Sequence, residues 1–296
     1  MPTFTRPTVT LDYDVVGPQH GRPLLLIMGL GMQRVAWPDA FVEALVARGF
    51  RVVTFDNRDV GLSTRYDQHP APGLFDMLAA RLGRGPAPAY RLSDIADDGA
   101  ALLDHLGFER AHVAGISMGG MIAMHLAAQH PARVLSLTLM ATSSGRLGLP
   151  PPRPRVLQVA FSRPDPAAGP DAAVDYAVRM FTTLGGSGYP TGPETIRERA
   201  GCQATRAARG TGINRQMAAI AADGDRSALL RQLRMPVLIL HGSDDPMVPP
   251  AHGHQLARLL PHARFELVEG WGHDLPDALA PRFAEAISEL AAAGDA

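Results

Sequence analysis

Residues 111–120 read AHVAGISMGG, and this stretch decides the fold. Four residues typical of a buried strand run into a G-x-S-x-G pattern, and an apolar helical pattern begins at Met118. A serine held on a sharp turn between a strand and a helix is the arrangement of a nucleophile elbow. Gly115 and Gly119 keep that turn free of bulky side chains beside Ser117. The pattern predicts Ser117 as a nucleophile. The alternative is a glycine-rich turn whose serine caps the helix.

The segments on either side of this turn alternate between strand and helix patterns. A half-exposed strand is expected at residues 8–15, and short apolar runs predict buried strands after it. The runs are residues 24–28, 51–55, 111–114, 134–139, 236–240 and 264–267, and the helical patterns are residues 38–48, 93–106, 118–129, 252–259 and 276–292. The alternation predicts an α/β fold with a mostly parallel central sheet flanked by helices. Functional groups of such sheets collect on loops at the carboxyl ends of the strands.

One region interrupts the alternation. Residues 143–226 hold no strong strand pattern, begin with a proline-rich stretch, and include helical patterns at residues 171–183 and 194–208. A helical cap inserted into the sheet fold is favoured over a proline-rich linker with surface helices, because the strand pattern resumes at residue 236. The expected organisation is a core of residues 1–142 and 227–296, with a cap of residues 143–226 above the site.

A serine hydroxyl needs a base to remove its proton and a carboxylate to orient that base. His273 is the histidine placed for this role, because it lies in a glycine-rich loop between the last predicted strand and the last predicted helix. Asp244 and Asp245 follow the strand at residues 236–240, and both are candidates for the carboxylate, with Asp245 preferred. The chain order Ser117, Asp245, His273 is that of α/β-hydrolases and differs from the chymotrypsin and subtilisin orders.

The composition argues against several other classes of protein. Lys and Arg number 28 and Asp and Glu 29, so the formal net charge is -1 and the basic surface that nucleic acid requires is absent. Cys202 is the only cysteine, which excludes an intrachain disulfide and a cysteine zinc cluster. No apolar run approaches the roughly 20 residues that cross a bilayer, so membrane insertion is not expected. We expect a cytoplasmic monomer or homodimer that needs no metal and no organic cofactor.

Further motifs resemble one family of enzymes. Residues 28–30 read MGL, residues 37–39 read WPD and residues 56–63 read DNRDVGLS. With the GISMG elbow, they make the chain resemble an α/β-hydrolase across residues 8–292 and, among these, the aclacinomycin methylesterase-like proteins. The resemblance places the acid and the base at Asp245 and His273. Many members have His-Gly where this chain has Met28-Gly29, and Arg-Gly where it has Arg58-Asp59. These departures leave the triad intact but make the transfer of a substrate class unsafe.

An acyl-transfer enzyme must also stabilise the charge that develops on the carbonyl oxygen. The backbone N–H of Met118, which follows the nucleophile, is one expected donor, and the resemblance implies the N–H of Leu30 as the other. Apolar contacts with the substrate are expected from Gly29, Met32, Trp37, Phe161 and Phe181.

These features together predict a serine hydrolase that cleaves small to medium hydrophobic carboxylic esters through an acyl-enzyme intermediate. The expected partner is therefore a small-molecule ester. The same triad could instead act on another substrate, as in a lactonase, a C–C bond hydrolase or a perhydrolase. A ligand-binding protein without catalysis is a further alternative, which the intact set of Ser117, Asp245 and His273 argues against.

Overall fold

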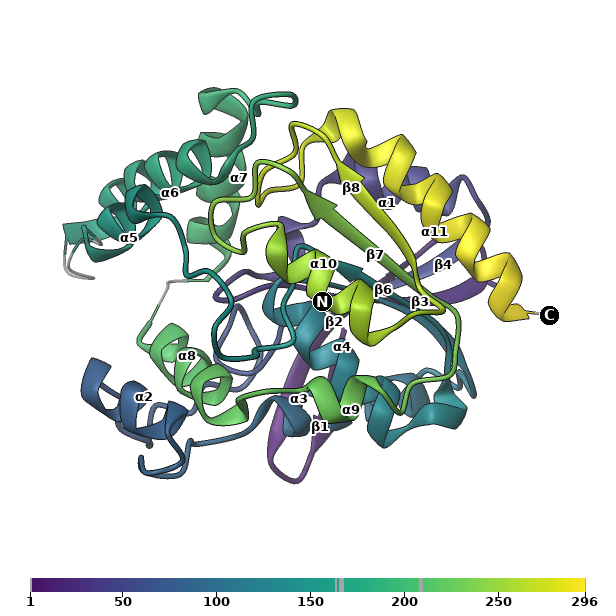
Figure 1. Cartoon of the computed structure of the whole chain (residues 1–296), viewed down its shortest axis with the longest axis horizontal. Helices are drawn as coiled ribbons and strands as arrows, with labels where there is room; N and C mark the ends of the chain where they lie inside the picture. The colour runs from purple at the N-terminus through teal and green to yellow at the C-terminus, as the bar shows by residue number, and fades with distance from the viewer. Residues whose placement is uncertain (1, 163, 165–167, 208–209, 296) are drawn as a thin grey trace.

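A computed structural model describes residues 2–162, 164, 168–207 and 210–295. Its centre is an eight-stranded sheet with the order β1-β2-β4-β3-β5-β6-β7-β8 (Figure 1). β2 pairs antiparallel with both β1 and β4, and every other neighbouring pair is parallel. The strands are β1 (Thr3–Arg6), β2 (Val9–Val16), β3 (Arg22–Ile27), β4 (Phe50–Phe55), β5 (Ala111–Ile116), β6 (Val134–Met140), β7 (Val237–Gly242) and β8 (Arg264–Val268). The predicted α/β fold with a mostly parallel sheet is confirmed.

Helices cover both faces of the sheet, and the alternation of side chains along β3 shows how. Leu24 and Leu26 pack in the cluster that includes α1 (Asp39–Val46) and α11 (Ala280–Asp295). Leu25 and Ile27 belong to the opposite cluster, with residues of the helices on the other face. Those helices are α3 (Leu92–His105), α4 (Met118–Gln129), α9 (Ser227–Leu230) and α10 (Ala251–Leu259). Burial on both faces explains why the central strands are continuous apolar runs.

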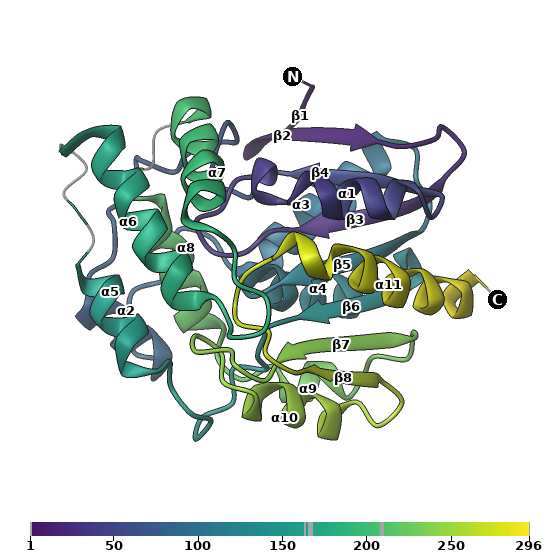
Figure 2. The same cartoon turned by 90° about the horizontal axis from the view of Figure 1, so that it is seen from above.

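Five of the helices that the structure describes lie between β6 and β7, and the first four form an insert. Figure 2 shows this helical insert, hereafter the cap, beyond one end of the sheet and far from the C-terminus. Its helices are α5 (Pro154–Phe161), α6 (Gly169–Leu184), α7 (Pro193–Arg206) and α8 (Gly212–Asp223). The patterns at 171–183 and 194–208 correspond to α6 and α7; α7 ends at Arg206, and Ala208 lies outside the described residues. The domain boundaries at 142/143 and 226/227 stay a prediction.

Several elements are absent from the predictions above. β1 has four residues at the edge of the sheet, and α2 (Leu74–Arg81) buries none of its side chains, so neither has a clear apolar periodicity. The helix expected at 276–292 begins as a separate 3-10 turn, η4 (Asp277–Leu279), and two further turns of this kind are η1 (Arg34–Ala36) and η2 (Pro131–Arg133). In the part of the chain that the structure describes, no helix is long and apolar enough to cross a membrane.

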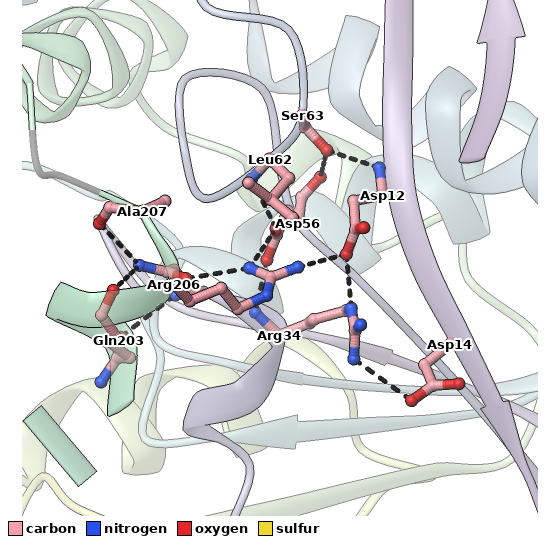
Figure 3. Close-up of polar contacts among 10 residues, drawn as sticks. Asp12, Asp14, Arg34, Asp56, Leu62, Ser63, Gln203, Arg206 and Ala207 are labelled. Carbon is pink, nitrogen blue, oxygen red and sulfur yellow. Dashed lines mark hydrogen bonds and ion pairs between the residues drawn. The ribbon is translucent and has the colours of Figure 1, made fainter. Parts of the chain in front are cut away.

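Buried arginines of the cap are paired with carboxylates of the core. Figure 3 shows the guanidinium of Arg206, at the end of α7, between the carboxylates of Asp12 on β2 and Asp56 after β4. Its Nη1 donates to Asp56 Oδ2 at 2.7 Å, and the side chains of all three residues are at most 6% exposed. Arg215 of α8 makes a second buried pair, with Nη2 2.7 Å from Asp59 Oδ1. Two cap helices are therefore held to the core through charged groups that water does not reach.

Candidate active site

Ser117 occupies the turn between β5 and α4 with a φ of 55°, in the left-handed region that non-glycine residues rarely adopt. A Cβ atom on Gly115 would lie 2.3 Å from the carbonyl oxygen of Gly119. A Cβ atom on Gly119 would lie 1.9 Å from the carbonyl oxygen of Ile27. Both distances are far below van der Waals contact, so the turn requires glycine at these positions. This strained turn has the form of a nucleophile elbow, with the serine at the carboxyl end of a central strand.

The three residues predicted as a triad lie within hydrogen-bonding distance of one another. His273 Nδ1 is 2.7 Å from Asp245 Oδ2, and His273 Nε2 is 3.1 Å from Ser117 Oγ. The other oxygen of Asp245 accepts hydrogen bonds from the backbone N–H groups of Met247 and Val248, at 2.9 and 2.7 Å. Because an ionised carboxylate only accepts, Nδ1 carries the imidazole proton and Nε2 is free to accept from the serine hydroxyl.

The structure distinguishes the two carboxylates that follow β7. Asp245 is fully buried and faces His273, whereas Asp244 faces the cap. Asp244 Oδ2 accepts hydrogen bonds from the backbone N–H and the hydroxyl of Ser187, at 2.9 and 2.5 Å. These hydrogen bonds lower the pKa of the Asp244 carboxyl. The preferred candidate, Asp245, is thus the one that lies beside the imidazole, and Asp244 instead ties the connection between α6 and α7 to the core.

A second histidine, His241 at the end of β7, lies behind Asp245. Its Nε2 is 3.7 Å from Asp245 Oδ2 and 2.7 Å from the carbonyl oxygen of Val248, which accepts its N–H. Burial lowers the pKa of His241, so this ring is neutral at physiological pH. His241 supports the loop that carries the acid and does not compete with His273 for Ser117.

The loop after β3, where the second oxyanion donor is expected, is held by a side chain of the cap. The backbone N–H of Gly31, which has a φ of 67°, donates to Gln216 Oε1 at 2.8 Å. Gln216 Nε2 donates in turn to the carbonyl oxygen of Arg58 at 2.8 Å. Gln216 is fully buried on α8, so the cap positions the residue next to Leu30. The sequence did not identify Gln216, because nothing in α8 marks which polar side chain reaches a distant loop.

Ser117 and His273 open onto a cavity of about 260 Å³ between the core and the cap. The cap supplies an apolar wall from α6, and the core supplies the loop after β3 together with residues that follow β8. The residues that line the cavity include Gly29, Leu30, Met32, Phe181, Thr191, Arg199, Asp274 and Leu275. Three of the five residues predicted to contact the substrate, Gly29, Met32 and Phe181, therefore line the cavity, and so does Leu30.

Two predicted pocket residues lie elsewhere. Trp37 is 3% exposed and belongs to the core cluster under α1, where its ring stacks on Phe41 with centroids 5.5 Å apart. Phe161 is 78% exposed at the end of α5 and is not among the residues that line the cavity. Neither side chain lines this cavity, so contact of Trp37 and Phe161 with a substrate stays a prediction. Met118, the other expected oxyanion donor, opens α4 with its side chain buried.

The fold and the geometry of Ser117, Asp245 and His273 define an α/β hydrolase, and comparison with known families agrees. Residues 22–277 match the profile of the alpha/beta hydrolase fold family, so the chain belongs to that family. It is similar to the rhodomycin D methylesterases DnrP of Streptomyces peucetius and DauP of Streptomyces sp. (strain C5), at 34% and 32% identity, with 97% of each chain covered. The predicted resemblance is confirmed.

The fold is also shared with solved structures. A meta-cleavage product hydrolase from Pseudomonas fluorescens superimposes with a TM-score of 0.75, and 98% of this chain and 97% of that one are covered. The two sequences are 19% identical, so this likeness concerns the fold alone.

Proposed function

We propose that this protein is a serine hydrolase that cleaves carboxylic esters through an acyl-enzyme intermediate. The observation that supports this best is the hydrogen-bonded series from Asp245 through His273 to Ser117, with the serine and the imidazole at the wall of one cavity. A ligand-binding protein has no need of a buried carboxylate, an oriented imidazole and a strained serine in this order. A hydrolase of the α/β fold requires all three.

The proposed reaction has two steps. Ser117 Oγ attacks the ester carbonyl carbon while His273 Nε2 takes the hydroxyl proton, and Asp245 stabilises the imidazolium that forms. The N–H groups of Leu30 and Met118 bind the oxyanion, and the alcohol leaves with the proton from His273. A water molecule then gives a proton to His273 and attacks the acyl carbon. The acid is released, and the proton returns to Ser117.

The cavity supports an ester of small to medium size with hydrophobic groups. Its volume of about 260 Å³ and its apolar wall from α6 favour the binding of hydrophobic groups next to Ser117. The similarity to two rhodomycin D methylesterases supports a small alcohol group such as methanol. We therefore propose a carboxylic ester with a small alcohol part as the substrate class.

Kinetics with p-nitrophenyl esters of increasing acyl length tests this function. Ser117→Ala should abolish turnover, and Asp245→Asn should lower kcat by about 10⁴-fold, because the imidazole loses the partner that sets its tautomer. Asp244→Asn is the matched control: it removes the neighbouring carboxylate, which bonds Ser187 and not His273, and should change kcat far less. Turnover that survives Ser117→Ala, or equal losses in the two aspartate variants, would contradict the proposal.

A further inference from the structure

Asp274 follows His273 in the chain and lines the same cavity as Ser117. It is 7% exposed, and its Oδ1 is buried without a hydrogen-bond partner. Its Oδ2 has one weak partner, the hydroxyl of Thr191 at 3.4 Å. Among the described residues that line the cavity, Asp274 is the only one with a buried side-chain oxygen or nitrogen left unpaired. The cavity wall thus holds a strong acceptor that the protein itself does not satisfy.

The cation lining the same cavity is committed to another carboxylate. Arg199 Nη2 donates to both oxygens of Asp277, at 2.6 and 2.7 Å, and its Nη1 lies 3.5 Å from the carbonyl oxygen of Leu275. Asp274 therefore faces the cavity without the counterion that a buried carboxylate ordinarily has.

The backbone of Asp274, and not its side chain, makes the hydrogen bond that fixes this part of the loop. The indole N–H of Trp271 donates to the backbone carbonyl oxygen of Asp274 at 2.9 Å, and this bond would persist with any side chain at 274. Burial raises the pKa of the Asp274 carboxyl to about 6, with the nearby His273 opposing the rise. At neutral pH the group is thus mostly an ionised acceptor in an apolar setting, and its contacts within the protein do not offset the cost of burial. Such a group is expected where a ligand completes the pairing.

We propose that Asp274 determines specificity by accepting a hydrogen bond from a hydroxyl or ammonium group of the ester substrate. The inference rests on the proposed esterase function and narrows its substrate class to esters that carry such a donor within reach of the cavity wall beside His273. A site built to bind a donor rejects an analogue without it more strongly than an apolar pocket discriminates by size, because the acceptor is then left unpaired. The hydroxyl of Thr191 lies beside the same carboxylate and is placed to contact the oxygen of a bound hydroxyl.

Matched ester pairs test this inference. The p-nitrophenyl ester of 3-hydroxybutyrate is compared with that of butyrate, and 2-hydroxyethyl butyrate with propyl butyrate. The 2-(dimethylamino)ethyl ester of butyrate, cationic at neutral pH, separates an ammonium from a hydroxyl donor. We expect wild-type kcat/KM to favour at least one donor-bearing ester by about tenfold or more, the range of a hydrogen bond to a charged group. Asp274→Leu should remove this preference, and Asp274→Asn, which keeps a carbonyl acceptor, should retain part of it.

Asp244→Asn is the matched control, since it alters a carboxylate that bonds Ser187 and does not line the cavity, and it should keep the wild-type preference. Thermal melting of each variant verifies folding. A wild-type enzyme that favours no donor-bearing ester, or a preference that persists unchanged in Asp274→Leu, would overturn the inference.

The esterase function and the role of Asp274 are measured separately. Labelling of Ser117 by a fluorophosphonate reports whether the serine is reactive in each variant. The same intact esters are titrated by calorimetry into Ser117→Ala protein, with and without Asp274→Leu. Here the affinity ratio within each pair reports recognition by Asp274 without turnover. Loss of labelling with a retained affinity ratio refutes the esterase function alone, whereas labelling with no Asp274-dependent ratio refutes the role of Asp274 alone.

Discussion

Asp274 is a single carboxyl group whose burial links stability to pH. Its pKa in the folded protein is raised from 3.8 to about 6, chiefly by burial, with Asp245 adding to the rise and His273 and Thr191 opposing it. A raised carboxyl pKa means that the folded state binds the proton more tightly than the unfolded state does. The contribution of this group to the free energy of unfolding is then fully present below the unfolded pKa and is lost as the pH rises through about 6.

Asp274→Asn should therefore stabilise the protein at alkaline pH. The shift of about two units corresponds to roughly 3 kcal/mol at about pH 8, and the gain should shrink to about half near pH 5. Urea unfolding at the two pH values measures the difference. A gain that is the same at both, or a loss at the higher pH, would show that the Asp274 carboxyl is not held out of water.

Individual residues differ in how well sequence predicts them. Ser117, Asp245 and His273 could be proposed from the sequence because each follows a predicted strand and the three occur in a known order. Asp244 and Asp245 are adjacent, and only the hydrogen bonds of Ser187 and His273 tell them apart. Gln216 and Asp274 were not predicted because their roles depend on which loop or cavity they reach, and for the same reason the sequence did not show that Trp37 and Phe161 lie outside the cavity lining.

The cap is fastened to the core by the ion pairs of two of its helices. Arg206 of α7 reaches Asp12 and Asp56, and the pairing carboxylates are at most 1% exposed. Removal of one partner from a buried pair is costly, because the remaining charges stay out of water. Arg34 continues to pair with Asp12 through its Nε at 2.6 Å and therefore relieves part of that cost.

Arg206→Leu should lower the free energy of unfolding by about 3 kcal/mol, the lower end of the range for broken buried pairs. Arg197→Leu on the same helix is the matched control, because the pair of Arg197 with Asp175 is 56% and 52% exposed. Such an exposed pair contributes about 1 kcal/mol or less. Urea denaturation of the two variants gives the comparison, and equal effects would mean that the Arg206 pairs do not hold the cap.

Secondary structure was predictable where burial gives the sequence a regular pattern of apolar residues. Every strand from β2 to β8 lies within two residues of its expected position, because each is an apolar run or alternates between two environments. β1 and α2 lack that signal, since β1 is a short edge strand and α2 exposes Leu74, Phe75, Leu78 and the adjoining Leu82. The cap was predicted as a region, but its contacts with the core come from long polar side chains without periodicity.

In the whole molecule, the sheet positions the three residues of the triad, and the cap forms the other wall of the cavity. The carboxyl ends of β5, β7 and β8 bring Ser117, Asp245 and His273 together. The cap closes the cavity above them and binds the loop that carries Leu30 through Gln216. The family and its general chemistry follow from the sheet, while the choice of ester depends on the cavity between the two parts.

Covalent labelling of Ser117 tests the central claim most directly. The folded wild-type protein is incubated with a fluorophosphonate probe, digested, and mapped by mass spectrometry, with Ser117→Ala protein in parallel. An activated serine should form a single adduct on the peptide that contains Ser117, and the variant should form none. A folded wild-type protein that stays unlabelled, or that is labelled equally in the Ser117→Ala variant, would contradict the assignment of Ser117 as the nucleophile.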